Sequence, residues 1–249
     1  MRFLILTLVA YGLGAPPASA GSASTGYSKC AKPSRDLLDN ILSLAPSNSL
    51  LGNFDGVPVS LPREALEIVE YDKPSPDGHR SFGRPIRSLS FHIALKGLKY
   101  EWPSQQKISE RPINTTVLVS VNGNSNYPGK RSVQNLVDNY VDSLPYIYEH
   151  AGISHGLDAY RSVKTPANSS LNRPYIYTKM AATAEAAVFI RCSERHYVTA
   201  TCEMNFTTEP QFPAVVIGTF RTSFLPYWAD IKLRVSDILF DFCFTPSLK

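Results

Sequence analysis

The sequence predicts an α+β fold with antiparallel strands in two successive groups, each closed by an amphipathic helix, and with a disulfide-braced hairpin. Three observations lead to this fold class. Short runs rich in β-branched and aromatic residues follow one another, each group of runs ends in a segment with helical apolar spacing, and two cysteines flank a polar turn. Strands and helices that are grouped, instead of alternating, are typical of α+β domains.

The first twenty residues have the features of a signal peptide. Arg2 precedes an apolar run over residues 3–13, and Ala18 and Ala20 suit an A-x-A cleavage site. The apolar run is too short to span a hydrocarbon layer of roughly 30 Å, and no later window holds about 18 consecutive apolar residues. We therefore expect an exported protein, no transmembrane segment in the mature chain, and a mature domain at residues 21–249.

The first half of the mature chain is predicted to contain strands followed by a helix. In residues 87–95, Leu89, Phe91 and Ile93 alternate with small or polar neighbours, which is the period of a strand with one buried face. Residues 63–72 fit a helix or a strand equally well. The other expected elements are a short helix at 34–44, an extended segment at 55–62, a strand at 114–121 and a helix at 132–144 that is capped by Ser132.

The second half repeats this order of strands and helix. In the last segment Trp228, Ile231 and Val235 are spaced by three and four, as on one face of a helix, and Pro226 suits the first helical turn. The expected elements are strands at 157–163, 173–179, 186–192, 196–206 and 214–222, and a helix at 225–242. The order is consistent with two similar halves, about 21–146 and 147–249, although no residue-level repeat is found.

The four cysteines of an exported chain favour disulfides over a metal site. Cys192 and Cys202 flank a polar turn between two β-rich runs, which predicts a bridge across a hairpin. Cys30 and Cys243 lie near the two ends of the chain, and a bridge between them would close a loop worth around 5 kcal/mol in the chain-entropy model. Sequence spacing does not fix connectivity, so this second pairing stays open.

Charge and motif content argue against several functions. Without the signal peptide the chain has 24 basic and 21 acidic residues, a formal net charge of +3, and no run of five basic residues. A nucleic-acid partner is therefore not expected. His150 and His155 are five positions apart, which does not place them on one helical face, and no H-E-x-x-H, paired C-x-x-C or Gly-rich phosphate loop occurs. We expect neither a metal nor a cofactor.

The pentapeptide GISHG, Gly152 to Gly156, fits the G-x-S-x-G pattern of a nucleophile elbow. It nominates Ser154 as an esterase nucleophile, with His155 or His196 as the base. An elbow requires a buried strand before the serine and a helix after it. Here the preceding run leaves a helix and the following run is typical of a strand, so we expect a loop between a helix and a strand and no catalytic residue. A secreted serine esterase that uses Ser154 is the alternative.

Five blocks of the sequence resemble successive segments of periplasmic immunity proteins that are paired with lipase effectors, particularly phospholipase effectors, of type VI secretion systems. The resemblance covers about residues 50–243. The blocks are NFDGVPVSLPREALEIVEYD, RSLSFHIALKGL, GISHGLDAYRSV, FIRCSERHYVTATCEMNF and FRTSFLPYWADIKLRVSDILFDF. The cysteine pair in a hairpin and the terminal helix that opens with Leu-Pro and a Trp are its most specific points. The chain departs from many relatives in lacking a lipoprotein cysteine.

The resemblance implies a periplasmic protein that binds its cognate phospholipase toxin and occludes the toxin's active site. Such a protein needs no catalytic residue, and it needs rigidly displayed loops. Two loops with many turn-forming residues, Asp72–Arg84 and Asn122–Arg131, are the candidate interface; the alternative is that they are solvated connections. The candidate partner-binding residues are Asp72, Asp77, His79, Arg80, Arg84, Tyr127, Lys130 and Arg131. A generic periplasmic binding protein is a further alternative, because no catalytic motif is present.

Overall fold

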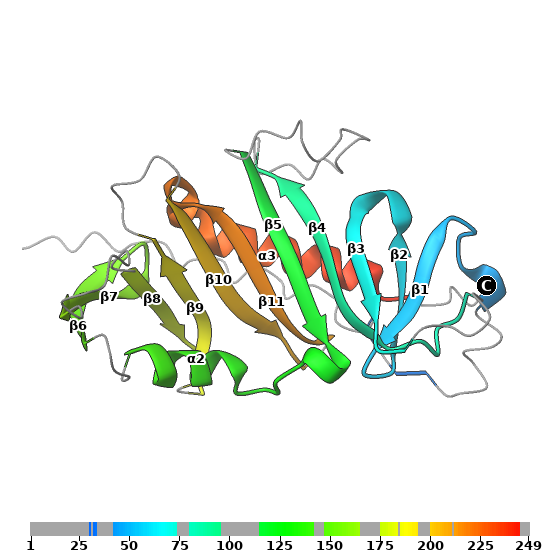
Figure 1. The fold of residues 1–249 in the computed structure, drawn as a ribbon, viewed down its shortest axis with the longest axis horizontal. Coiled ribbons are helices and arrows are strands. Elements are labelled where there is room, and N and C mark those ends of the chain that lie inside the picture. Colours follow the sequence, from blue (N-terminus) through cyan, green and yellow to red (C-terminus); the bar gives the residue numbers. More distant parts are fainter. Residues whose placement is uncertain are drawn as a thin grey trace, which may run out of the picture.

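The computed structural model describes residues 30, 32–33, 42–73, 80–95, 115–141, 147–164, 175–183, 185–193, 200–210 and 212–244. The predicted signal peptide lies outside these residues. Within them, a nine-stranded antiparallel sheet has the strand order β3-β4-β5-β11-β10-β9-β8-β7-β6, and a separate hairpin is formed by β1 and β2 (Figure 1). The predicted α+β class is thus confirmed.

The elements have the following bounds. The hairpin consists of β1, Ser49–Phe54, and β2, Val57–Pro62. The sheet consists of β3, Leu66–Tyr71, β4, Ile86–Ala94, β5, Thr116–Gly123, β6, Ile147–Ser154, β7, Leu157–Lys164, β8, Tyr175–Met180, β9, Ala186–Cys192, β10, Thr201–Thr208, and β11, Phe212–Arg221. The α-helices are α2, Ser132–Val141, and α3, Trp228–Phe242. Short 3-10 helices are η2, Leu42–Leu44, η3, Arg63–Ala65, η7, Asn124–Asn126, and η8, Thr222–Tyr227.

The two groups of strands form one sheet because the last strand, β11, lies between β5 and β10. Val216 of β11 is opposite Val121 of β5, and Ile217 is opposite Asn205 of β10. A strand from the end of the chain thus joins the first group to the second.

The main core lies between one face of the sheet and α3. In β4 the alternate residues Leu89, Phe91 and Ile93 are buried, as their period of two predicts. The ring of Phe91 meets that of Phe242 edge to face, with centroids 5.8 Å apart. The helix side chains that complete this core are Ile231, Val235, Ile238, Leu239 and Phe242. Each such side chain contributes about 1.5–3 kcal/mol when it is fully buried.

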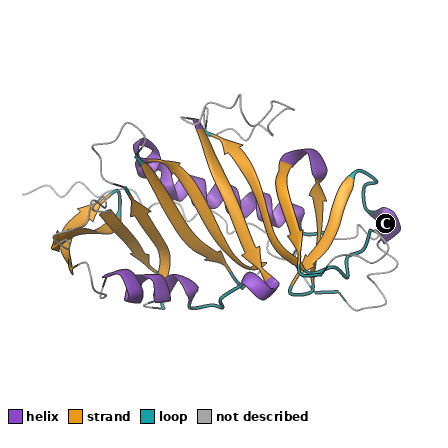
Figure 2. Ribbon diagram, viewed as in Figure 1, coloured by secondary structure: helices purple, strands orange, loops and turns teal. Residues whose placement is uncertain are grey.

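The opposite face of the sheet is covered in part by α2 (Figure 2). Ile190 belongs to the core under α3, whereas its neighbour Phe189 packs with Val133 of α2. Successive side chains of a strand point to opposite faces, so the two helices lie on opposite faces of the sheet. The predicted cap by Ser132 is wrong, because Ser132 begins the helix and its hydroxyl has no hydrogen-bond partner among the described residues.

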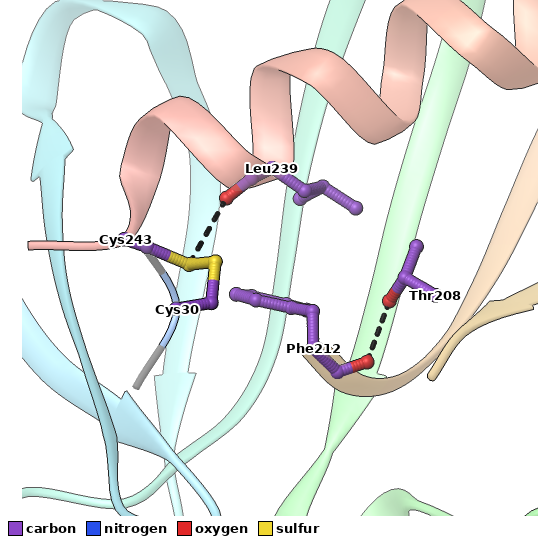
Figure 3. The surroundings of a disulfide bond; sticks show 5 residues. All are labelled: Cys30, Thr208, Phe212, Leu239 and Cys243. Carbon is purple, nitrogen blue, oxygen red and sulfur yellow. Dashed lines mark hydrogen bonds between the residues drawn. A yellow bond between two sulfur atoms is a disulfide. The ribbon is translucent and has the colours of Figure 1, made fainter. Parts of the chain in front are cut away.

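Both disulfides are present. Cys192 and Cys202 are directly opposite each other in β9 and β10, which confirms the predicted bridge across a hairpin. Cys30 pairs with Cys243 just after α3, a sequence separation of 213 residues (Figure 3). Cys243 also pairs with Val59 in an isolated bridge, so the second disulfide fastens the end of α3 beside the β1–β2 hairpin.

Several element boundaries differ from those expected. Residues 63–72, which fit a helix or a strand, form η3 followed by β3. The terminal helix begins at Trp228, because Pro226 lies in the 3-10 helix η8 before it. Neither β1 nor β6 was expected, since their sequences lack a clean alternation of apolar and polar residues. Most of the helix expected at 34–44 lies outside the described residues.

Candidate partner-binding surface

The described residues of the two loops singled out from the sequence lie at one edge of the sheet. Since β3, β5 and β10 alternate with antiparallel neighbours, their carboxyl ends face the same way. The chain that follows each of these strands therefore reaches a common edge. We call this surface the loop edge and define it as residues 72–73, 80–85, 124–131 and 209–210, together with Arg87.

Asn124 ties the loop edge to the β1–β2 hairpin and to β4. Its amide nitrogen donates to the carbonyl oxygens of Asn53, at 2.9 Å, and Ile86, at 2.8 Å. Its amide oxygen accepts the N–H of Asp55 at 2.9 Å. Asn124 has a φ of 45°, in the left-handed region that asparagine tolerates better than most residues. One side chain thus makes three hydrogen bonds to the backbone of two other segments.

Hydrogen bonds join the loop after β5 to Asp72 and to the start of β4. The hydroxyl of Ser125 donates to the carboxylate of Asp72, and Arg87 donates from Nε to Asn126 at 3.0 Å. The backbone N–H of Asp72 is satisfied by the carbonyl of Pro85 at 3.0 Å. The loop edge is therefore held in one arrangement by hydrogen bonds between segments that lie far apart in the sequence.

Tyr127 and Lys130 converge on Glu209, in the turn between β10 and β11. The Tyr127 hydroxyl donates to one carboxylate oxygen of Glu209, and the Lys130 ammonium lies 3.8 Å from the other. Glu209 is 15 % exposed, whereas Lys130 is 79 % exposed. Burial raises the pKa of Tyr127, and the hydrogen bond to Glu209 and its negative charge raise it further. Tyr127 is therefore a neutral donor, beside a lysine that projects into solvent.

The remaining candidate residues occupy both ends of the loop edge. Arg131 lies 3.7 Å from Glu185, at the start of β9, and both side chains are largely exposed. At the other end, Arg80 donates to the carbonyl of Pro46 and, at 3.1 Å, to Ser49. The guanidinium of Arg84 stacks on the ring of Tyr71. Asp77 and His79 lie outside the described residues.

Some contributors to the loop edge were not nominated from the sequence. Asn124, Ser125 and Asn126 lie within a predicted loop, but nothing in the local pattern shows which of them bonds inward. Glu209 lies in a different hairpin and reaches Tyr127 only through the pairing of β10 with β11 and of β11 with β5. Asn122, Asn124 and Asn126 follow a predicted strand at alternate positions, and this is the one signal that could have indicated a turn held by side-chain hydrogen bonds.

The segment around Ser154 is a β-hairpin and not a nucleophile elbow. Ser154 and Leu157 are paired across a two-residue turn in which His155 has φ 54° and Gly156 has φ 74°. Two positive φ values are the mark of a tight hairpin turn. The expected loop between a helix and a strand is therefore wrong, because Ser154 is the last residue of strand β6. The carbonyl of His155 accepts the indole N–H of Trp228 at 2.9 Å, and His196 lies outside the described residues.

In the part of the chain that the structure describes, no group of three or more His, Cys, Asp or Glu side chains could hold a metal ion. No helix among the described residues is long and apolar enough to cross a membrane.

Comparison with known proteins gives one likeness of fold. No protein-family model matches the chain, and no curated protein matches it significantly. A similar solved structure is that of Smlt3025, an immunity protein of the Stenotrophomonas maltophilia type IV secretion system. The likeness has a TM-score of 0.54 at 14 % sequence identity and covers 78 % of this chain and 93 % of that chain. At this identity the likeness shows a shared fold.

Proposed function

We propose that this protein is a periplasmic immunity protein that binds a cognate secreted toxin and occludes its active site, and that the toxin is a phospholipase effector. The observation that carries the proposal is the likeness of fold to a secretion-system immunity protein over most of both chains. The five sequence blocks that resemble immunity proteins of lipase effectors support it independently. Inhibition of this kind is stoichiometric and requires no catalytic group in the inhibitor.

The expected periplasmic location agrees with the disulfides. Disulfides persist in oxidising compartments such as the periplasm and are rare in the cytosol. The structure contains Cys30–Cys243 and Cys192–Cys202 and has no free cysteine among the described residues. Together with the predicted signal peptide at residues 1–20, the two bridges support export.

We place the toxin interface at the loop edge. A tight inhibitor gains affinity when its binding loops are ordered before the partner arrives, because less conformational entropy is lost on association. The bonds of Asn124, Ser125 and Tyr127 provide such ordering. Tyrosine and arginine are common anchors of protein interfaces. In this proposal Tyr127 and Arg131 are anchors, and Lys130 steers the partner by its exposed charge.

Two secretion machines are candidate sources of the toxin. The sequence blocks favour a phospholipase that is delivered by a type VI secretion system. The fold likeness to an immunity protein of a type IV secretion system makes a toxin delivered by that machine the second candidate. The loop-edge interface is the same in both cases, so the difference lies in the partner and not in the chemistry of this chain.

Co-purification with the effector encoded beside the gene tests the proposal. The exported protein and the effector are produced together, and the complex is assayed for stoichiometry and for hydrolysis of phospholipid vesicles. We expect a one-to-one complex without phospholipase activity. Absence of a complex would contradict the immunity function, and a complex that inhibits a toxin of another activity would contradict only the phospholipase assignment.

Matched variants test the interface. The double variant Tyr127→Ala and Lys130→Ala should release the effector faster. The control, Tyr227→Ala with Lys179→Ala, removes the same two residue types outside the loop edge and should leave binding intact. Equal binding by both double variants would exclude the proposed roles of Tyr127 and Lys130 in the interface. If the purified protein hydrolyses phospholipid or p-nitrophenyl esters and Ser154→Ala abolishes this activity, the esterase alternative holds instead.

A further inference from the structure

A basic cavity adjoins the loop edge between the start of β1 and the end of β3. Its volume is about 590 Å³. Its described lining consists of residues 47–51 together with Arg63, Glu64, Tyr71, Arg80 and Arg84. A volume of several hundred cubic ångströms accommodates a few side chains of a protruding peptide segment, and not merely a single ion.

The cavity has an excess of positive charge. Among the lining residues that the structure describes, there are three guanidinium groups and one carboxylate. Within the part of the chain that the structure describes, none of Arg63, Arg80 and Arg84 forms an ion pair, although ion pairs form elsewhere at the loop edge. The partners of Arg80 are neutral oxygens of Pro46 and Ser49, which leave its charge uncompensated.

Arg84 is held in place by packing and retains unused donor capacity. Its guanidinium lies over the ring of Tyr71, with 3.6 Å from Cζ to the ring centroid. The Tyr71 hydroxyl donates to the carbonyl of Leu51 at 3.1 Å and so fixes the ring. The Nε of Arg84 is buried and has no hydrogen-bond partner among the described residues. Burial raises the pKa of Tyr71, and the charges of Arg84 and Arg63 oppose that rise, so both cations lie near the ring.

We propose that this cavity receives an acidic segment of the toxin, with an Asp or Glu carboxylate bound by the guanidiniums of Arg63 and Arg84. The inference rests on the proposed immunity function and specifies the chemistry of the partner. Guanidinium groups bind carboxylates through two parallel N–H···O bonds, a geometry that lysine cannot reproduce. The hydroxyl and amide groups of residues 47–49 would then bind polar backbone atoms of the same segment.

The affinity of the effector complex tests this inference. We expect Arg63→Gln with Arg84→Gln to weaken binding of the effector by about tenfold or more, because a desolvated carboxylate loses both ionic partners. The control Arg161→Gln removes one arginine charge from β7, near the far edge of the sheet, and should change affinity less than about twofold. Replacement of both cavity arginines by lysine should restore only part of the affinity. Thermal denaturation of each variant verifies that it is folded.

The binding assay and an NMR titration together separate this inference from the proposed function. If wild-type protein binds the effector and the double glutamine variant binds it equally well, the inference is wrong and the immunity function stands. If wild-type protein binds no effector, the immunity function is wrong. In the absence of effector, an acetylated and amidated tri-aspartate peptide is titrated while the Arg84 Nε–H resonance is observed by NMR.

The peptide titration has its own decisive outcomes. A saturable shift of the Arg84 resonance that disappears in the Arg63→Gln variant supports a carboxylate site, provided that a tri-lysine peptide causes no shift. Inorganic phosphate is titrated in parallel. Binding of phosphate without binding of the tri-aspartate peptide would overturn the assignment to a carboxylate, and so would equal shifts with both peptides.

Discussion

The hydroxyl of Tyr127 donates a hydrogen bond to the carboxylate of Glu209 across a sequence separation of 82 residues. This contact joins the loop that follows β5 to the turn that follows β10. It also lies at the centre of the loop edge, between the ordered turn at Asn124 and the exposed Lys130. The bond is thus one of several that order the proposed interface, and it involves a tyrosine that is not part of the buried core.

Replacing Tyr127 with Phe should lower the free energy of unfolding by about 1–3 kcal/mol, because the mostly buried Glu209 carboxylate loses its hydrogen-bond donor while the ring remains. Urea denaturation gives the difference. Tyr160→Phe is the control, since no described residue bonds the Tyr160 hydroxyl, and it should change the free energy by less than about 0.5 kcal/mol. Equal losses in the two variants would refute the role of the Glu209 bond.

Stability should fall at alkaline pH. Burial and Glu209 raise the pKa of Tyr127 above its ordinary value of 10.0. As pH rises past that value the unfolded chain releases a proton that the folded chain keeps, so the free energy of unfolding decreases. The contribution is complete below the ordinary value and is lost toward the raised pKa. Urea denaturation at increasing pH should show a weaker decline in Tyr127→Phe; Tyr71, whose pKa is also raised, accounts for part of the remainder.

Asn124 allows backbone strain and hydrogen bonding to be measured separately. Asn124→Ala removes three side-chain hydrogen bonds and keeps a Cβ at φ 45°, where those bonds no longer offset the strain. Asn124→Gly removes the same bonds but tolerates that φ. We expect Ala to cost about 2–4 kcal/mol and Gly roughly 1 kcal/mol less. Equal unfolding free energies for the two variants would show that the left-handed conformation is not strained.

Gly123, the last residue of β5, lies against Phe54 of the β1–β2 hairpin. A Cβ there would lie 2.1 Å from Cδ1 of Phe54, whose buried ring packs 4.7 Å from the ring of Phe212. Gly123→Ala should therefore cost about 1–3 kcal/mol through overpacking. At Gly218, in the neighbouring strand β11, the nearest atom to a Cβ would be the Met204 methyl at 3.6 Å. Gly218→Ala should be close to neutral, and similar calorimetric melting temperatures for the two variants would contradict this difference.

Much of the secondary structure could be predicted because it depends on local spacing. The alternation of Leu89, Phe91 and Ile93 predicted β4, and the helical spacing from Ile231 to Phe242 predicted most of α3. The strand β6 could not be predicted in this way. It lies at the sheet edge, where Ile147 and Ile153 are exposed, so its apolar residues do not follow the burial pattern of an interior strand.

Several residues of the candidate site could be predicted from the sequence, but the contacts between them could not. The sequence nominated Asp72 and Tyr127 as loop residues, but it did not indicate that the two loops meet or that Glu209 joins them. Nor did it nominate Arg63, which reaches the basic cavity beside Arg80 and Arg84 only because η3 folds next to the start of β1. Such contacts require knowledge of which strands are neighbours.

The sequence by itself determined the elements whose stability is local: alternating strands, two amphipathic helices, and a disulfide between residues that face each other across a short hairpin. Only the tertiary structure decided that Cys30 pairs with Cys243, that β11 joins the two groups of strands, and that the loops after β3, β5 and β10 share one edge. The physical reason is that local patterns follow from the geometry of a few neighbouring residues, whereas strand order and long-range pairing are chosen by packing of the whole chain.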